Sequence, residues 1–456
     1  MNLRLNFVLG LAVGATILGE ASAQSSSSPL TLHDAVAIAL EKNPLRKAAL
    51  ADTRVASADT QTARSFLLPH LSFTETATRG NDPVYVFGSR LRQEHFSQAD
   101  FALNRLNRPL PFANFATRFG GAWNLFDSFA SWRGLTRARL MDQAAKHQLD
   151  RTEQQVVFQV IESYDEVLLA AKQLDVAEYA TRIAQSIVER SQVRFESGVV
   201  VESDLLTAKV RLASRQQEAI HARNNLALAR AQLNTSMGVP IESSFDLTQT
   251  LSEPQLPALA LQELESTALG SRPDLKRIAA QQDAQRQTVS MAKSSFGPQL
   301  NAFAGWELDN PTFLSGGGGN NWVGGLELKV DLFQGGAKRA EWYRQRALEE
   351  KSSAMKQAAT DRVRLEVRRA YYDVDASRQQ MEVAHASIAQ AQDSLRINQD
   401  RYETGLVTIT DLLSAEDASR RSETVYWEAV SRLRTSYAGL ELATGTLNSE
   451  SGAVMP

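Results

Sequence analysis

The chain contains one stretch twice: residues 194–208 read RFESGVVVESDLLTA, and residues 401–415 read RYETGLVTITDLLSA. Identical residues recur at a constant spacing of 207 without a gap, among them Gly198/Gly405 and Asp204/Asp411. Helical apolar patterns precede and follow both copies. Glycine tolerates the positive φ found at helix C-termini, and an aspartate early in a helix suits its exposed N–H groups. The repeat therefore predicts two tight turns, each joining two long helices.

The segments around these turns predict two long helical hairpins. Residues 131–194 and 338–401 lack proline and have Gly134 as their only glycine, so each is predicted as one helix of about 96 Å at 1.5 Å per residue. The turns are predicted at residues 195–203 and 402–410. The returning helices are predicted at residues 203–237 and 410–444. The long helices make the chain mainly α.

A small β part is predicted between the shorter and the longer helices of each half. Helical patterns over residues 31–66 and 261–296 end near Pro69 and Pro298, and the apolar period then changes from 3.6 to 2. Strands are expected at about 70–79, 117–126, 299–308 and 322–333. In the last strand, one face carries only uncharged residues, and the resemblance described below makes it the lipid-facing strand: Trp322, Leu326, Leu328 and Val330.

These elements divide the chain into a two-fold internal repeat. Residues 24–237 form the first repeat, residues 238–260 a linker, and residues 261–445 the second repeat. Residues 446–456 are predicted as a disordered tail. The loop between the two strands is 22 residues longer in the first repeat, from Leu71 to Asn124 against Leu300 to Asp331.

The N-terminus predicts export. Residues 1–23 read as a cleaved secretory signal, with Arg4, an apolar stretch over residues 5–18, and Ala21-Ser22-Ala23 before the cleavage site. The chain has no cysteine, which excludes disulfides, thiolate metal sites and a lipidated N-terminal cysteine. A net charge of −3 gives no reason to expect nucleic-acid binding.

Catalytic, cofactor and metal sites find no support in the sequence. The six histidines have no partner at helical spacing, and the glycine run at residues 316–319 is not followed by the Lys-Ser/Thr of a phosphate loop. Glu162, Asp165 and Glu166 are assigned to a solvated helix face. The chain is therefore predicted not to be an enzyme.

The predicted elements need neighbours that one chain cannot supply. A helix of about 96 Å must cover its apolar stripe along its whole length, and four strands cannot close a barrel. Both needs are met if several copies assemble around an axis.

The chain resembles the outer-membrane factor family, the TolC-like outer-membrane efflux proteins. The resemblance is carried by LTLHDAVAIALEKNP (30–44), SRPDL (271–275), NLFDS (124–128), DLFQGG (331–336) and both turn stretches. It implies a homotrimer in the outer membrane, with a 12-stranded membrane β-barrel and an α-barrel tunnel that extends into the periplasm. It also implies a passive exit duct for efflux or type I secretion, coupled to a periplasmic adaptor and an inner-membrane transporter, with drugs, metals or proteins as cargo.

The resemblance also implies roles for the turn residues. The periplasmic gate is expected at Asp411, Asp204 and Tyr402, with a bond from Asp204 to the Tyr402 hydroxyl. Adaptor-docking tips are expected at Gly198, Val199, Gly405 and Leu406. The alternative is a secreted or periplasmic coiled-coil scaffold, which would not require a strand with one apolar exposed face.

Overall fold

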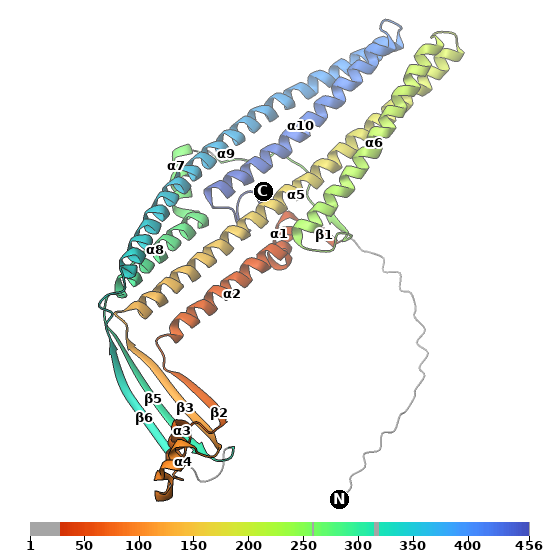
Figure 1. Cartoon of the computed structure of the whole chain (residues 1–456). Helices are drawn as coiled ribbons and strands as arrows, with labels where there is room; N and C mark the ends of the chain where they lie inside the picture. Colours follow the sequence, from red (N-terminus) through yellow and green to blue (C-terminus); the bar gives the residue numbers. More distant parts are fainter. Residues whose placement is uncertain (1–27, 258–259, 314–318, 456) are drawn as a thin grey trace, which may run out of the picture.

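The computed structural model describes residues 28–257, 260–313 and 319–455, so the predicted signal sequence lies outside the described residues. The described chain is elongated. Two helical hairpins project from one end, a four-stranded sheet lies at the other, and shorter helices surround the middle (Figure 1).

The same order of elements occurs in both halves. Each half runs through two short helices, two strands, a 67-residue helix and a 36-residue helix. The helices of the first half are α1 (Leu32–Lys42), α2 (Pro44–Ser65), α5 (Ala130–Glu196) and α6 (Glu202–Met237). Those of the second are α7 (Leu261–Ser271), α8 (Pro273–Ser294), α9 (Ala337–Glu403) and α10 (Ile409–Thr444). The long helices begin and end within two residues of the predicted bounds.

The main core lies in the middle of the molecule, where α1, α5, α6 and α10 meet. The Tyr164 side chain of α5 is completely buried there, and its hydroxyl donates to the Leu30 carbonyl of strand β1 (Ser28–Leu30) at 3.1 Å. Strand β1 pairs in parallel with β4 (Phe245–Leu247), which lies in the predicted linker. The linker thus contributes to the core instead of only connecting the halves.

The C-terminal residues belong to the same core, so the prediction of a disordered tail is wrong for residues 446–455. Leu447 and Val454 are each 1% exposed and pack in the core with Leu30. The Glu441 carboxylate of α10 accepts a hydrogen bond from the Ala453 backbone N–H at 3.2 Å. The prediction followed the polar composition of this segment and overlooked its two buried apolar residues, Leu447 and Val454.

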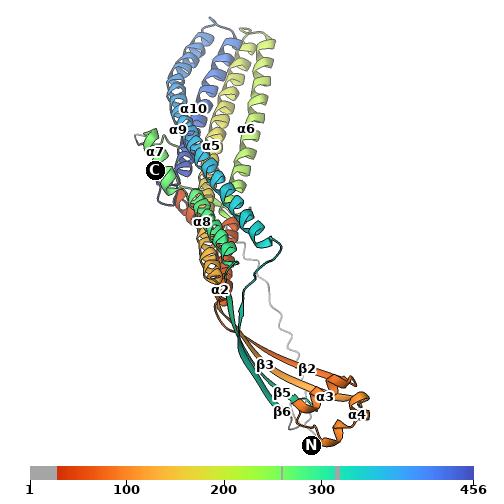
Figure 2. The same cartoon turned by 60° about the vertical axis from the view of Figure 1, so that its left-hand side comes forward.

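The four-stranded sheet is antiparallel throughout, in the order β2-β3-β5-β6. Its strands are β2 (His70–Gly80), β3 (Phe112–Phe126), β5 (Gln299–Asn310) and β6 (Gly319–Lys329). β3 begins five residues before the prediction. β6 ends at Lys329, four residues before its predicted end, so Val330 follows the strand instead of lying in it. Figure 2 shows the four strands extending beyond the end of the helical part.

The register gives the sheet one mainly apolar and one mainly polar face. Phe73, Phe119 and Trp306 are neighbours on one face, with ring centroids 5.2 and 5.7 Å apart along the series. Successive side chains of a strand point to opposite faces. Arg118 and Glu307 therefore lie on the other face, where their side chains form an ion pair at 2.7 Å.

The longer first loop is folded. It contains α3 (Pro83–Arg92), a 3-10 turn (Gln98–Phe101) and α4 (Leu103–Asn107), which lie at the far end of the sheet (Figure 1).

Candidate functional site

The ends of the two hairpins, residues 194–208 and 401–415, form matching turns. Gly198 and Gly405 have φ of 72° and 75°, in the left-handed region that favours glycine. In the first turn the Val199 N–H donates to the Arg194 carbonyl at 2.8 Å. The equivalent bond in the second turn, from Leu406 to Arg401, is 2.9 Å. These bonds satisfy carbonyls left free at a helix C-terminus and fix both turns.

Apolar side chains stand out from these turns into solvent. Val199 is 62% exposed and Leu406 is 76% exposed, and both directly follow the glycine of their turn. A rigid turn that exposes apolar side chains is suited to contact another protein.

Contacts across the hairpin ends join α5 to α9. Arg190 of α5 forms an ion pair with Glu403 of α9 at 2.6 Å. Arg194 donates to the Tyr402 carbonyl at 2.7 Å, and its guanidinium lies 4.9 Å from the centre of the Tyr402 ring. Sequence reasoning missed Arg190, because the equivalent position in the second repeat is Ile397 and the repeat gives no signal there.

The predicted bond between Asp204 and the Tyr402 hydroxyl is wrong for the single chain. Tyr402 is buried, and within the described residues its hydroxyl oxygen has no hydrogen-bond partner. Arg194 contacts the Tyr402 carbonyl and ring instead. Asp204 is half-buried in the first turn of α6.

Asp411 has a capping role at the start of α10. The Thr408 N–H and hydroxyl donate to its carboxylate at 3.0 and 2.6 Å, and the Asp411 N–H donates back to the Thr408 hydroxyl oxygen. These bonds lower the pKa of Asp411 below its ordinary value of 3.8. Asp411 is therefore held as an exposed anion close to the turn.

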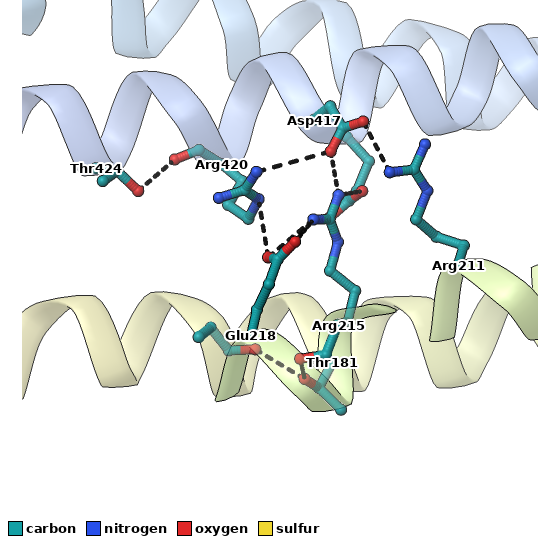
Figure 3. A network of polar contacts seen from close by, with 9 residues as sticks. Thr181, Arg211, Arg215, Glu218, Asp417, Arg420 and Thr424 are labelled. Carbon is teal, nitrogen blue, oxygen red and sulfur yellow. Dashed lines mark hydrogen bonds and ion pairs between the residues drawn. The ribbon is translucent and has the colours of Figure 1, made fainter. Parts of the chain in front are cut away.

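A buried ionic cluster joins α6 to α10 farther along the hairpins (Figure 3). Arg215 of α6 is 1% exposed and donates to Glu416 of α10 at 2.7 Å and to Glu218 at 2.9 Å. It also contacts Asp417 of α10. Arg211 pairs with the same Asp417 at 2.9 Å. The cluster ties the first hairpin to the second.

The cluster keeps its charges. Burial would raise the pKa of Asp417, but the hydrogen bond and charge of Arg215, with Arg211 and Arg420, hold that pKa below its ordinary value. Burial opposes the charge of Arg215, but bonds to Glu416 and Asp417 outweigh it and raise the Arg215 pKa. The site is a salt bridge of permanent charges. Its residues are about 200 positions apart, and the repeat does not reveal them.

A second buried ion pair lies nearer the middle of the molecule. Asp165 of α5 and Arg434 of α10 are 2.9 Å apart and both buried. The assignment of Asp165 to a solvated face is therefore wrong, whereas Glu162 and Glu166 are exposed. Burial raises the pKa of Asp165 to about 6, although the charge and hydrogen bond of Arg434 lower it. The second carboxylate oxygen of Asp165 has no hydrogen-bond partner among the described residues.

The structure places three of the four predicted strand residues on one face of β6. Trp322, Leu326 and Leu328 are all exposed, and they pair with Trp306, Ala302 and Leu300 of β5. Val330 is also exposed, beyond the end of the strand. The apolar face of the sheet is thus open to its surroundings in the single chain.

Metal-binding clusters and membrane-spanning helices are both absent from the described residues. No group of three or more histidine and acidic side chains there is arranged to hold a metal ion. Within residues 28–257, 260–313 and 319–455, none of the helices has the length and apolar character needed to cross a membrane.

Most of the chain, including both long hairpins, matches one family. The sequence matches the family described as outer membrane efflux protein over residues 35–239 and 264–446, and the chain belongs to that family. The predicted family and its outer-membrane location are confirmed.

Individual relatives agree with this assignment. The chain is 24% identical to the outer membrane protein TolC of Escherichia coli, over 97% of this chain and 87% of TolC. It is 23% identical to the alkaline protease secretion protein AprF of Pseudomonas aeruginosa, over 92% and 85% of the two chains. Its structure resembles the CmeC outer membrane channel of Campylobacter jejuni, with a TM-score of 0.78, 17% identity, and coverage of 97% and 95%.

Proposed function

We propose that three copies of this chain form a passive exit duct through the outer membrane and across the periplasm. Each copy contributes four strands to a closed 12-stranded barrel, and the hairpins of the three copies form a tunnel. A periplasmic adaptor and an inner-membrane transporter load the duct and supply the energy. The duct needs no catalytic residue of its own.

The observation that carries this proposal is the sheet. Its edge strands β2 and β6 each pair on one side, and the apolar side chains of Leu71, Phe73, Trp322, Leu326 and Leu328 are exposed on one face. In a bilayer, every backbone N–H and C=O group needs a partner, so a spanning sheet must close on itself. Other copies of the chain supply the missing strands, and the apolar face then contacts lipid while the polar face lines the lumen.

The hairpin ends supply the contacts of the duct at its periplasmic end. Val199 and Leu406, placed by Gly198 and Gly405, dock on the adaptor. Asp411 of the three copies forms a ring of negative charge where the hairpins converge, with Asp204 and Tyr402 beside it. An acidic ring in a narrow pore attracts cations.

Membrane fractionation and reconstitution test the assembly. The chain should appear in the outer-membrane fraction as a trimer, and the purified trimer should conduct ions across planar bilayers. Recovery as a soluble periplasmic monomer would instead support a helical scaffold and overturn the proposal.

Single-channel recording tests the acidic ring. Asp411→Ala should reduce cation selectivity, whereas Asp52→Ala of α2, far from the turns, is the control and should not. Unchanged selectivity in Asp411→Ala would leave that residue with the capping role alone.

A further inference from the structure

The loop between β2 and β3 lies on the polar face of the sheet. Arg92, at the end of α3, pairs with Glu307 of β5 at 3.4 Å. The next residue, Gln93, is completely buried and donates to the Asn114 side chain of β3 at 2.6 Å. Asn114 in turn donates to Asp309 of β5 at 2.6 Å. The three strand residues of these contacts, Glu307, Asn114 and Asp309, lie on the face opposite Phe119 and Trp306.

The helix crosses most of the sheet. At its start, the Tyr85 hydroxyl donates to the Thr78 carbonyl of β2 at 2.8 Å. At its end, the Arg92 carbonyl lies against Gly319 of β6, where a Cβ atom would stand 1.7 Å from that oxygen. A cavity of approximately 450 Å³ separates α3 from the strands and is lined by Thr74, Thr76 and other polar-face residues. The position of α3 is therefore fixed at both sheet edges.

One flank of α3, beside the side that contacts the strands, is apolar and exposed. Tyr85, Ser89 and Arg92 face the strands, and at 100° per residue Leu91 and Val84 fall together on one flank of the helix, where Val84 also borders the cavity. Phe87 lies next to Leu91 on this flank and packs in part against Phe96 of the same loop, with ring centroids 4.8 Å apart. Val84 is 81% exposed and Leu91 is 49% exposed. Apolar side chains so placed would face the water of the duct unless another surface covers them.

We propose that three copies of α3 meet through Val84, Phe87 and Leu91 and form an apolar constriction at the outer mouth of the duct. This inference rests on the proposed trimer. A barrel of 12 strands about 4.8 Å apart and tilted about 45° has a backbone radius of about 13 Å, and a helix on its inner wall occupies about 10 Å of it. Three helices leave little open width, and the covering surface is the same helix of the other two copies.

An apolar constriction has a functional consequence. Narrow pores lined by apolar side chains resist passage of water and ions by dewetting. The outer mouth then restricts small ions while admitting cargo whose apolar groups replace the water. This constriction is separate from the acidic ring, which lies at the opposite end of the molecule.

Cysteine crosslinking tests the constriction independently of conduction, because the chain has no native cysteine. Leu91→Cys trimers in outer membranes, treated with an oxidant, should give disulfide-linked dimers on denaturing gels. Leu326→Cys, on the apolar face of β6, is the matched control and should give none. Absence of dimers from Leu91→Cys in trimeric protein would overturn the inference and leave the trimer intact, with the apolar side of α3 covered by something other than its own copies.

Conductance gives the second measurement. Replacing residues 82–110 by Asn-Gly should raise single-channel conductance at least about two-fold, and Leu91→Asp should raise it while keeping the loop, since a charge wets an apolar constriction. Wild-type conductance in both variants would refute the constriction. A wild-type chain that forms neither trimers nor channels would instead refute the proposed function on which it rests.

Discussion

The buried cluster around Arg215 allows a sharp test of what joins the two hairpins. Arg215→Met removes the cation that faces Glu416, which is itself 3% exposed. Asp417 still has Arg211 as an ion-pair partner at 2.9 Å, and Glu218 still has Arg420 at 3.8 Å. The loss of stability therefore comes mainly from Glu416, which is left without a cation. Removing one partner of a buried ion pair costs about 3–5 kcal/mol.

Three further variants separate this cost from a general effect of mutation. Glu416→Gln leaves Arg215 bonded to Glu218 and Asp417, so it should cost only about 1 kcal/mol. Arg215→Met combined with Glu416→Leu removes both buried charges and should recover most of the loss. Arg223→Met is the matched control on the same helix, because the Arg223–Glu178 pair is exposed and worth about 0–1 kcal/mol.

Thermal unfolding of the detergent-solubilised trimer, followed by circular dichroism, gives the comparison. For a chain of this length, 1 kcal/mol corresponds to about 1–2 °C, so Arg215→Met should lower the midpoint by about 3–10 °C. Unfolding of such a protein is often irreversible, so all variants are heated at the same rate. A midpoint for Arg215→Met within 1 °C of the wild type, or a larger loss in Glu416→Gln, would refute the reasoning.

Three other outcomes are expected. Gly198→Val combined with Gly405→Val should abolish export while trimers persist, because valine is strained at φ near 70°. If the double variant still exports cargo in cells that lack the wild-type chain, adaptor docking at these turns is contradicted. Leu328→Arg should cost about 2–4 kcal/mol near the bilayer midplane and block insertion, whereas Lys329→Leu should insert normally. Equal amounts of the two variants in outer-membrane fractions would contradict the assignment of Leu328 to the lipid face and Lys329 to the lumen. The pKa of Asp165 is raised to about 6 from 3.8, so its contribution to stability is full below pH 3.8 and is lost as the pH rises through 6. The unfolding midpoint of Asp165→Asn should therefore rise relative to that of the wild type from pH 4 to pH 7. A difference between the two midpoints that stays constant over this range would contradict the shift.

The sequence predicted the parts of the fold that depend on local periodicity. The geometry of both turns could be predicted locally, because a glycine at the same position in each copy ends each long helix. Alternation located all four strands of the sheet, although β3 is longer and β6 shorter than expected. Periodicity says which face of an element is apolar but does not say what that face contacts.

The parts that the sequence did not predict depend on distant partners. In the other repeat, Arg215 corresponds to Ser422 and Glu416 to Lys209, so the ion cluster breaks the repeat that organised the prediction. The apolar pattern of the α3 segment is too short to predict where the helix lies. Its position depends on contacts with the strands, such as those of Tyr85 and Arg92. Asp165 looks solvated in the sequence because Glu162 and Glu166 beside it are.

The burial of Val454 together with Leu30 has a consequence for biogenesis. The first described strand and residues 447–454 complete one core, so the middle of the molecule can close only after Val454 has been translocated. Contacts between sequence-distant residues form late in folding because a long loop must close first. A chain truncated before Leu447 should therefore leave this core open and be degraded. Closure of the core thus depends on residues 447–454 having been translocated.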